Sequence, residues 1–167
     1  TPNYSTITQP TNNIFQGKGT KKITMEQYLN AGGDTNFKGQ MTTEQYNNAA
    51  ELIDKTNKLI SVLDLKNGVI LTSGGRTKEH HRQIYQQRGQ KAPEGSAHLS
   101  GQALDIYDPD GSIKKQLINN PRAAEIMKRE GIYIENPNMT GSWLHIQTKK
   151  PGYVGNEIWG HEQIMRK

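Results

Sequence analysis

The chain has 167 residues, of which 32% are hydrophobic, and its formal net charge is +5 at pH 7. This length suits one domain, and no apolar run approaches the ~18 residues that a membrane-spanning helix needs. The absence of cysteine excludes disulfides, thiolate metal ligands and a cysteine nucleophile. The basic charge has two interpretations, ordinary surface charge or an anionic partner such as a cell-wall polymer. Because no Lys/Arg block is interleaved with aromatic residues, a nucleic-acid partner is not expected.

The first 22 residues differ in composition from the rest of the chain. They are rich in Asn, Thr, Gln, Gly and Pro and poor in aliphatic side chains. This composition predicts an extended or disordered arm over 1–22 that becomes ordered against a partner, followed by one folded domain over 23–167. No leader pattern stands at the start of the chain, so the sequence predicts no signal peptide.

Two predicted helices begin with the same pattern, a threonine followed three residues later by a glutamine. Thr24 with Gln27 predicts a short helix that ends at about residue 30, and Thr42 with Gln45 predicts a helix that ends at about residue 63. The other predicted elements are a strand over 69–72, a helix from Thr77 to about 87, a strand over 104–107, helices over 113–118 and 121–130, strands over 132–134 and 143–148, and a tail over 152–167 with Ile158, Trp159, Ile164 and Met165 as docking residues.

These helices and short strands do not alternate in a regular βαβ pattern. Parallel sheets need such crossover units, whereas short strands joined without them form antiparallel sheets. The sequence therefore predicts an α+β fold in which helices flank a small antiparallel sheet.

Two short stretches contain the residue types that hold a catalytic metal. In the stretch 96–105, His98 and Asp105 lie seven positions apart with Gly101 between them, and His145 follows later in Trp143-Leu144-His145. Two imidazoles and one carboxylate form the ligand set of a catalytic zinc site that leaves its fourth position for water. Each histidine also has a plain structural interpretation, which for His145 is a side chain on the surface of a sheet.

The pattern Ser96-x-His98-x-x-Gly101-x-Ala103-x-Asp105 resembles the signature of a known enzyme family. This family is the zinc D-alanyl-D-alanine carboxypeptidases and their relatives, which include the vancomycin-resistance D,D-dipeptidases and the phage endolysins that cut L-alanyl-D-glutamate. Ser73-Gly74-x-Arg76 resembles the family's Ser-Gly-Tyr-Arg segment, with Gly75 in place of the tyrosine, and 131–145 resembles the segment that carries the last zinc ligand. The resemblance covers about residues 42–150.

The resemblance implies a role for five residues. His98, Asp105 and His145 would bind Zn²⁺ at the face of the sheet. Arg76 would face the substrate near the scissile bond, where a guanidinium group binds a carboxylate or stabilises an oxyanion. Ser96 matches a position that contacts substrate in the family, and its alternative interpretation is a serine of a turn.

The general base departs from the family pattern. In the best-known members a glutamate lies three residues before the last histidine, and here that position is Ser142. A serine cannot take a proton from water at neutral pH. Glu135, at the end of the strand that precedes this loop, is the candidate replacement, and a solvated loop residue is its alternative interpretation.

Two other patterns do not predict metal sites. His80 and His81 lack a histidine four residues further on, so they form no helical metal pair. Asp108 and Asp110 suggest a calcium loop, but its first and last ligand positions hold isoleucine and leucine.

Together, these features predict a zinc-dependent peptidase of bacteriophage or bacterial cell-wall origin. Its substrate would be the peptidoglycan stem peptide, cut at an amide next to a D-amino acid, either as a D,D-carboxypeptidase or as an L-Ala-D-Glu endopeptidase. The expected location is the virion or the host cell wall or periplasm. The alternative is a virion or cell-wall structural protein with a peptidase-like fold and little catalysis. Ser142 and the polar arm favour this alternative, and the arm would then bind other virion proteins.

Overall fold

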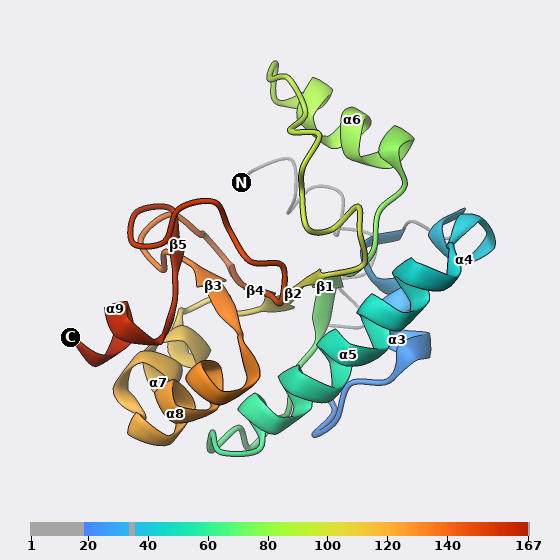
Figure 1. Cartoon of the computed structure of the whole chain (residues 1–167). Helices are drawn as coiled ribbons and strands as arrows, with labels where there is room; N and C mark the ends of the chain where they lie inside the picture. Colours follow the sequence, from blue (N-terminus) through green and yellow to red (C-terminus); the bar gives the residue numbers. More distant parts are fainter. Residues whose placement is uncertain (1–18, 34–35, 167) are drawn as a thin grey trace.

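The computed structural model describes residues 19–33 and 36–166, and within them the chain has an α+β fold (Figure 1). One antiparallel sheet holds five strands in the order β1-β2-β4-β3-β5. The strands are β1 Leu71–Ser73, β2 Ala103–Tyr107, β3 Tyr133–Glu135, β4 Trp143–Gln147 and β5 Ile158–Trp159. The predicted fold class is confirmed.

The two Thr–Gln patterns both begin helices as predicted. In each, the threonine hydroxyl accepts a hydrogen bond from the glutamine backbone N–H, and the glutamine side chain accepts one from the threonine N–H. These reciprocal bonds satisfy amide groups that the first helical turn leaves without a partner. The helices are α3 Met25–Asn30, η2 Ala31–Gly33, α4 Asn36–Gln40, α5 Thr43–Ile60, α6 Lys78–Gln87, α7 Ser112–Asn119, α8 Pro121–Glu130 and α9 His161–Met165.

The structure differs from the sequence-based prediction in several places. Helix α5 ends at Ile60 rather than near residue 63, because Ser61 already serves as its C-cap. Neither α4 nor β5 was predicted, since both are too short to show a period. In the tail, Ile164 is buried as predicted, but Met165 is 71% exposed, so its predicted docking is wrong.

The hydrophobic core lies on one face of the sheet. Alternate strand residues point to this face, and helices α3, α5, α7 and α8 cover it. Helix α6 stands apart, on the upper side of the sheet in the view of Figure 1. The strand residues in the core are Leu104, Ile106, Ile134, Leu144 and Ile146. The opposite face is therefore free to carry polar side chains.

Residues 1–18 of the predicted arm lie outside the described residues. The last part of the arm, 19–22, runs beside the segment that leads into β1, where Thr20 and Val69 exchange two backbone hydrogen bonds of 3.0 and 2.8 Å. Lys21 donates a further hydrogen bond to the Leu65 carbonyl. Among the described helices, none combines the length and the apolar character needed to cross a membrane.

Candidate metal centre

A row of polar residues crosses the sheet on the face opposite the core. Ser73 of β1 pairs with Asp105 of β2, and Asp105 pairs with His145 of β4. Strands β3 and β4 are antiparallel, and their register pairs Ile134 with Ile146. The next residue of β3, Glu135, therefore lies opposite His145. Directly opposed residues on neighbouring strands point to the same face. The strand pairing therefore brings two predicted metal ligands and the predicted base to one surface.

The third predicted ligand, His98, comes from the loop before β2. Gly101 in this loop has φ +75°, and a Cβ there would lie 2.7 Å from the Gln45 carbonyl oxygen. Gln45 in turn donates from its side chain to the Leu99 carbonyl at 2.9 Å, so the start of α5 holds the loop in place. Ser96 accepts a hydrogen bond of 3.3 Å from the His98 backbone N–H. This bond fits the turn interpretation of Ser96, and its contact with substrate stays a prediction.

His98, Asp105 and His145 form one buried cluster that can hold a metal ion. One ligand atom from each lies within 4.8 Å of the others. His98 Nε2 is 3.4 Å from Asp105 Oδ2, and His145 Nδ1 is 2.9 Å from Asp105 Oδ1. The three residues are 4%, 2% and 9% exposed, respectively. The predicted ligand set is therefore brought together, whereas the identity of the metal is not shown.

The outer nitrogen of each imidazole is fixed by a neighbouring acceptor. His98 Nδ1 donates to the Gly74 carbonyl oxygen at 2.8 Å. Gln147 donates from its amide nitrogen to the Lys149 carbonyl at 2.7 Å, so its amide oxygen faces His145 Nε2 at 2.8 Å and accepts from it. When neutral, both histidines therefore turn a lone pair toward the Asp105 carboxylate. Three acceptors that face one another in this way fit a cation between them.

The charges in the cluster agree with this arrangement. Burial, together with the nearby Arg76 guanidinium, lowers the pKa of His98 to about 4, so it is neutral at pH 7 as a metal ligand must be. Burial alone would raise the pKa of Asp105, but the two imidazoles hold it well below its usual range. Burial opposes the charged form of His145, yet its hydrogen bond to Asp105 raises its pKa. The raised pKa favours a proton on His145 beside the carboxylate, and a cation bound there would replace that proton.

Arg76 lies behind Asp105 rather than at the surface. Its Nη2 is 3.7 Å from Asp105 Oδ2, and its Nε and Nη2 are 3.3 and 3.2 Å from Ser73 Oγ. The side chain is only 5% exposed. The structure thus places Arg76 at the predicted centre, where its charge stabilises the carboxylate, and its direct contact with substrate stays a prediction.

Phe37 explains why glycine occupies position 75. A Cβ on Gly75 would lie 2.2 to 2.5 Å from atoms of the Phe37 ring, which is buried on α4. Any larger side chain at position 75 would collide with the Phe37 ring unless the ring moved. An aromatic ring from another part of the chain therefore fills the space beside Gly75, where the resembled family has its tyrosine.

Glu135 has the surroundings of a carboxylate that titrates at an elevated pH. It is half-buried, and burial raises its pKa although His145 acts in the opposite direction. A general base works best when its pKa approaches the working pH. Ser142, at the family's position for the base, accepts a backbone hydrogen bond of 2.8 Å from the Asp108 N–H.

Two residues of the centre were missed by the sequence analysis. Gln147 follows His145 by two positions on one strand, so the period of a strand already places both side chains on one face. His81 was rejected as a metal ligand, yet its ring contacts Arg76. The sequence analysis considered His81 only as a metal ligand, so it missed this contact with Arg76 five residues earlier.

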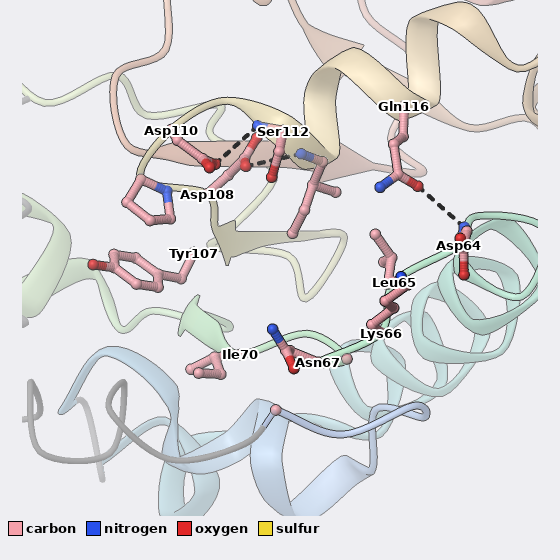
Figure 2. Close-up of a pocket in the computed structure, with 14 residues that line it drawn as sticks. Asp64, Leu65, Lys66, Asn67, Ile70, Tyr107, Asp108, Asp110, Ser112 and Gln116 are labelled. Carbon is pink, nitrogen blue, oxygen red and sulfur yellow. Dashed lines mark hydrogen bonds between the residues drawn. The ribbon is translucent and has the colours of Figure 1, made fainter.

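A separate pocket of about 680 Å³ lies between the 64–70 loop and the turn into α7 (Figure 2). Two of its acidic side chains, Asp108 and Asp110, bond to backbone amides. The Asp108 carboxylate accepts from the Ile113 and Lys114 N–H groups, each at 2.9 Å, and Asp110 accepts from Ser112 at 3.1 Å. These carboxylates cap helix α7, and none of the three candidate metal ligands lines the pocket.

Comparisons of the chain with models of known protein families, with curated proteins and with solved structures find no match. The function therefore has to be inferred from the site itself.

Proposed function

We propose that this protein is a zinc-dependent peptidase that hydrolyses the stem peptide of peptidoglycan at an amide next to a D-amino acid. The observation that carries the proposal is the convergence of His98 Nε2, Asp105 and His145 Nδ1, whose ligand atoms lie within 4.8 Å of one another. The resemblance of 96–105 to the signature of zinc D,D-peptidases and L-Ala-D-Glu endopeptidases supports this substrate class. The net charge of +5 is consistent with an anionic cell wall.

The donor set fits zinc or iron(II), and the resemblance of 96–105 to the signature of zinc peptidases favours zinc. Imidazole nitrogen and carboxylate oxygen are both common zinc ligands, and three protein ligands are typical of catalytic rather than structural sites. When bound, the ion would polarise the scissile carbonyl and lower the pKa of water. The chain's own contribution is orientation, because Gly74 and Gln147 fix the two imidazoles while Arg76 lies beside the carboxylate.

Glu135 would move the proton during hydrolysis. Its carboxylate takes a proton from the attacking water as the water oxygen bonds to the carbonyl carbon. The carbon–nitrogen bond then breaks, and the same proton passes from Glu135 to the leaving amine. The position of Glu135 opposite His145 in the strand register and its raised pKa both suit this role.

Mass spectrometry of purified muropeptides tests this function directly. The protein is incubated with them with and without a chelator, and the masses of the products name the bond that is cut. We expect a product that disappears with the chelator and returns when zinc is restored. A product insensitive to the chelator, or no product from zinc-loaded protein, would contradict the proposal.

The second candidate function is structural, within a virion or a cell wall. Ser142 favours it, because the position that holds the family's base carries no carboxylate here. Zinc-loaded protein that binds peptidoglycan but releases no product would support this candidate. In that case the metal cluster would stabilise the fold rather than act on a substrate.

A further inference from the structure

His81 is a buried histidine that the proposed mechanism does not use. It lies on α6 and is only 2% exposed. Both of its ring nitrogens have partners, since Nε2 is 2.9 Å from the Pro93 carbonyl oxygen and Nδ1 is 3.2 Å from Arg76 Nη1. One ring therefore joins the segment after α6 to the arginine beside the metal centre.

The two partners decide the state of the ring. A carbonyl oxygen only accepts, so Nε2 must carry the hydrogen and donate it to Pro93. A guanidinium group only donates, so Nδ1 must accept from Arg76 through its lone pair. His81 is therefore neutral, with its hydrogen on Nε2. Burial and the charge of Arg76, which together lower the pKa of His81, agree with this assignment.

Arg76 needs such an acceptor because its side chain is long and the cost of ordering it is high. Ser73 holds the guanidinium group from Nε and Nη2, and His81 holds it from Nη1. Asp105 lies next to the same Nη2, at 3.7 Å. The guanidinium group is thus held between a strand and a helix, with its charge directed at the carboxylate.

We propose that His81 is a positioning residue, which holds the Arg76 guanidinium against Asp105 by accepting a hydrogen bond at Nδ1. Its effect on turnover rests on the proposed function, whereas its effect on Arg76 does not. His81 touches neither substrate nor metal in this role. It acts through the arginine alone.

Two substitutions separate the two hydrogen bonds of His81. In His81→Asn, the amide oxygen takes the place of Nδ1 and can still accept from Arg76. In His81→Gln, the amide nitrogen reaches the place of Nε2 and can still donate to Pro93. His81→Leu removes both bonds, and Gln83→Leu on the exposed face of α6 serves as the control.

We expect activity and thermal stability to separate among these variants. His81→Asn should keep kcat/KM within about threefold while its Tm falls, because it loses the Pro93 bond. His81→Gln should lower Tm at least as much, because it loses a hydrogen bond to a charged group, and its kcat/KM should in addition fall roughly tenfold or more, through kcat. Activity that simply follows Tm across all the variants would overturn the proposal.

Nitrogen NMR provides a measurement that does not depend on activity. Long-range ¹H–¹⁵N correlation should show His81 as the neutral ring with its hydrogen on Nε2. The Arg76 side-chain N–H signal should exchange slowly in the wild type and in His81→Asn, and rapidly in His81→Gln. A charged ring or the opposite tautomer at pH 7 would overturn the proposal. If the wild type cleaves no peptide, the proposed function fails, and these spectra still decide the role of His81.

Discussion

His145 donates from Nε2 to the side-chain oxygen of Gln147 at 2.8 Å, and this bond determines which ring nitrogen faces Asp105. The Gln147 amide cannot turn over freely, because its nitrogen donates to the Lys149 carbonyl. The chain from Lys149 through Gln147 to His145 therefore presents Nδ1 to the metal cluster. Residues that hydrogen-bond to a metal ligand, as Gln147 does to the candidate ligand His145, commonly determine how tightly the metal is held.

Removing the Gln147 side-chain amide should weaken metal binding without removing a ligand. We expect Gln147→Leu to lower zinc affinity by roughly 10- to 100-fold, because the His145 ring loses the acceptor that fixes its orientation. Competition against a zinc-binding dye measures this change. Gln83→Leu, at an exposed position of α6, should leave the affinity unchanged. Equal affinities for Gln147→Leu and the wild type would show that the bond does not orient a ligand.

Replacing Glu135 should stop hydrolysis and leave the metal in place. Glu135→Gln removes the carboxylate that takes the proton, and such a loss typically costs about 10²- to 10⁴-fold in rate. Zinc content, measured on the same samples, should equal that of the wild type. If Glu135→Gln retains the wild-type rate, another group serves as the base.

The same carboxylate predicts the pH dependence of the wild type. A base works when deprotonated, and burial raises the pKa of Glu135 above the ordinary value of about 4.3. The acid limb of kcat should therefore lie at a higher pH than an ordinary glutamate would give, with activity rising as the pH rises. An acid limb centred at or below the ordinary glutamate pKa would contradict this interpretation.

The contribution of His98 to the stability of the metal-free protein should fall as the pH drops from about 6.5 to about 4. His98 has a pKa of about 4 in the folded protein, whereas an unfolded histidine titrates near 6.5. Between these values the unfolded chain binds the proton and the folded chain does not, so acid favours unfolding. One such group contributes a slope of roughly 1.4 kcal/mol per pH unit.

Denaturant unfolding at several pH values, with zinc removed, measures this slope. His98→Gln should reduce it, because the substituted side chain takes up no proton in this range. His81, whose pKa is also lowered, would keep part of the slope in that variant. An identical slope in His98→Gln and the wild type would show that His98 is not neutral in the folded protein.

Gly75 and Phe37 should behave as a coupled pair. Gly75→Tyr places atoms where the Phe37 ring lies, and overpacking of this kind costs about 1–3 kcal/mol or more. Adding Phe37→Gly should recover part of that loss, although Phe37→Gly is itself destabilising. A double-mutant cycle measures the coupling. Gly39→Tyr is the matched control, because a Cβ at Gly39 would meet no atom within 4 Å. If the changes in unfolding free energy caused by Phe37→Gly and Gly75→Tyr simply add, the two residues are not coupled.

Local patterns predicted most of the fold. Thr24 and Thr42 specified helix starts through their capping boxes, and Gly131 ended α8 in a left-handed conformation. Such signals lie within a few residues of one another, so they can be read along the chain. Two of the candidate ligands were predictable for a related reason, since His98 and Asp105 belong to one short motif.

Contacts between distant segments were not predictable in this way. Phe37 fills the space beside Gly75, but α4 is too short to show a period and its partner lies on another element. His81 was considered only as a metal ligand, and its hydrogen bond to Pro93 joins α6 to the segment that follows this helix. Side-chain contacts that join separate elements leave no periodic trace in one sequence.

Zinc titration of the metal-free protein decides whether the cluster of His98, Asp105 and His145 binds a metal ion. Isothermal calorimetry of the full chain should show one ion bound per chain, with binding abolished in His98→Ala and in Asp105→Asn. The loss is expected because each substitution removes one of three ligands that converge within 4.8 Å. Zinc binding that persists unchanged in both variants, or no binding by the wild type, would contradict the metal centre and the function proposed from it.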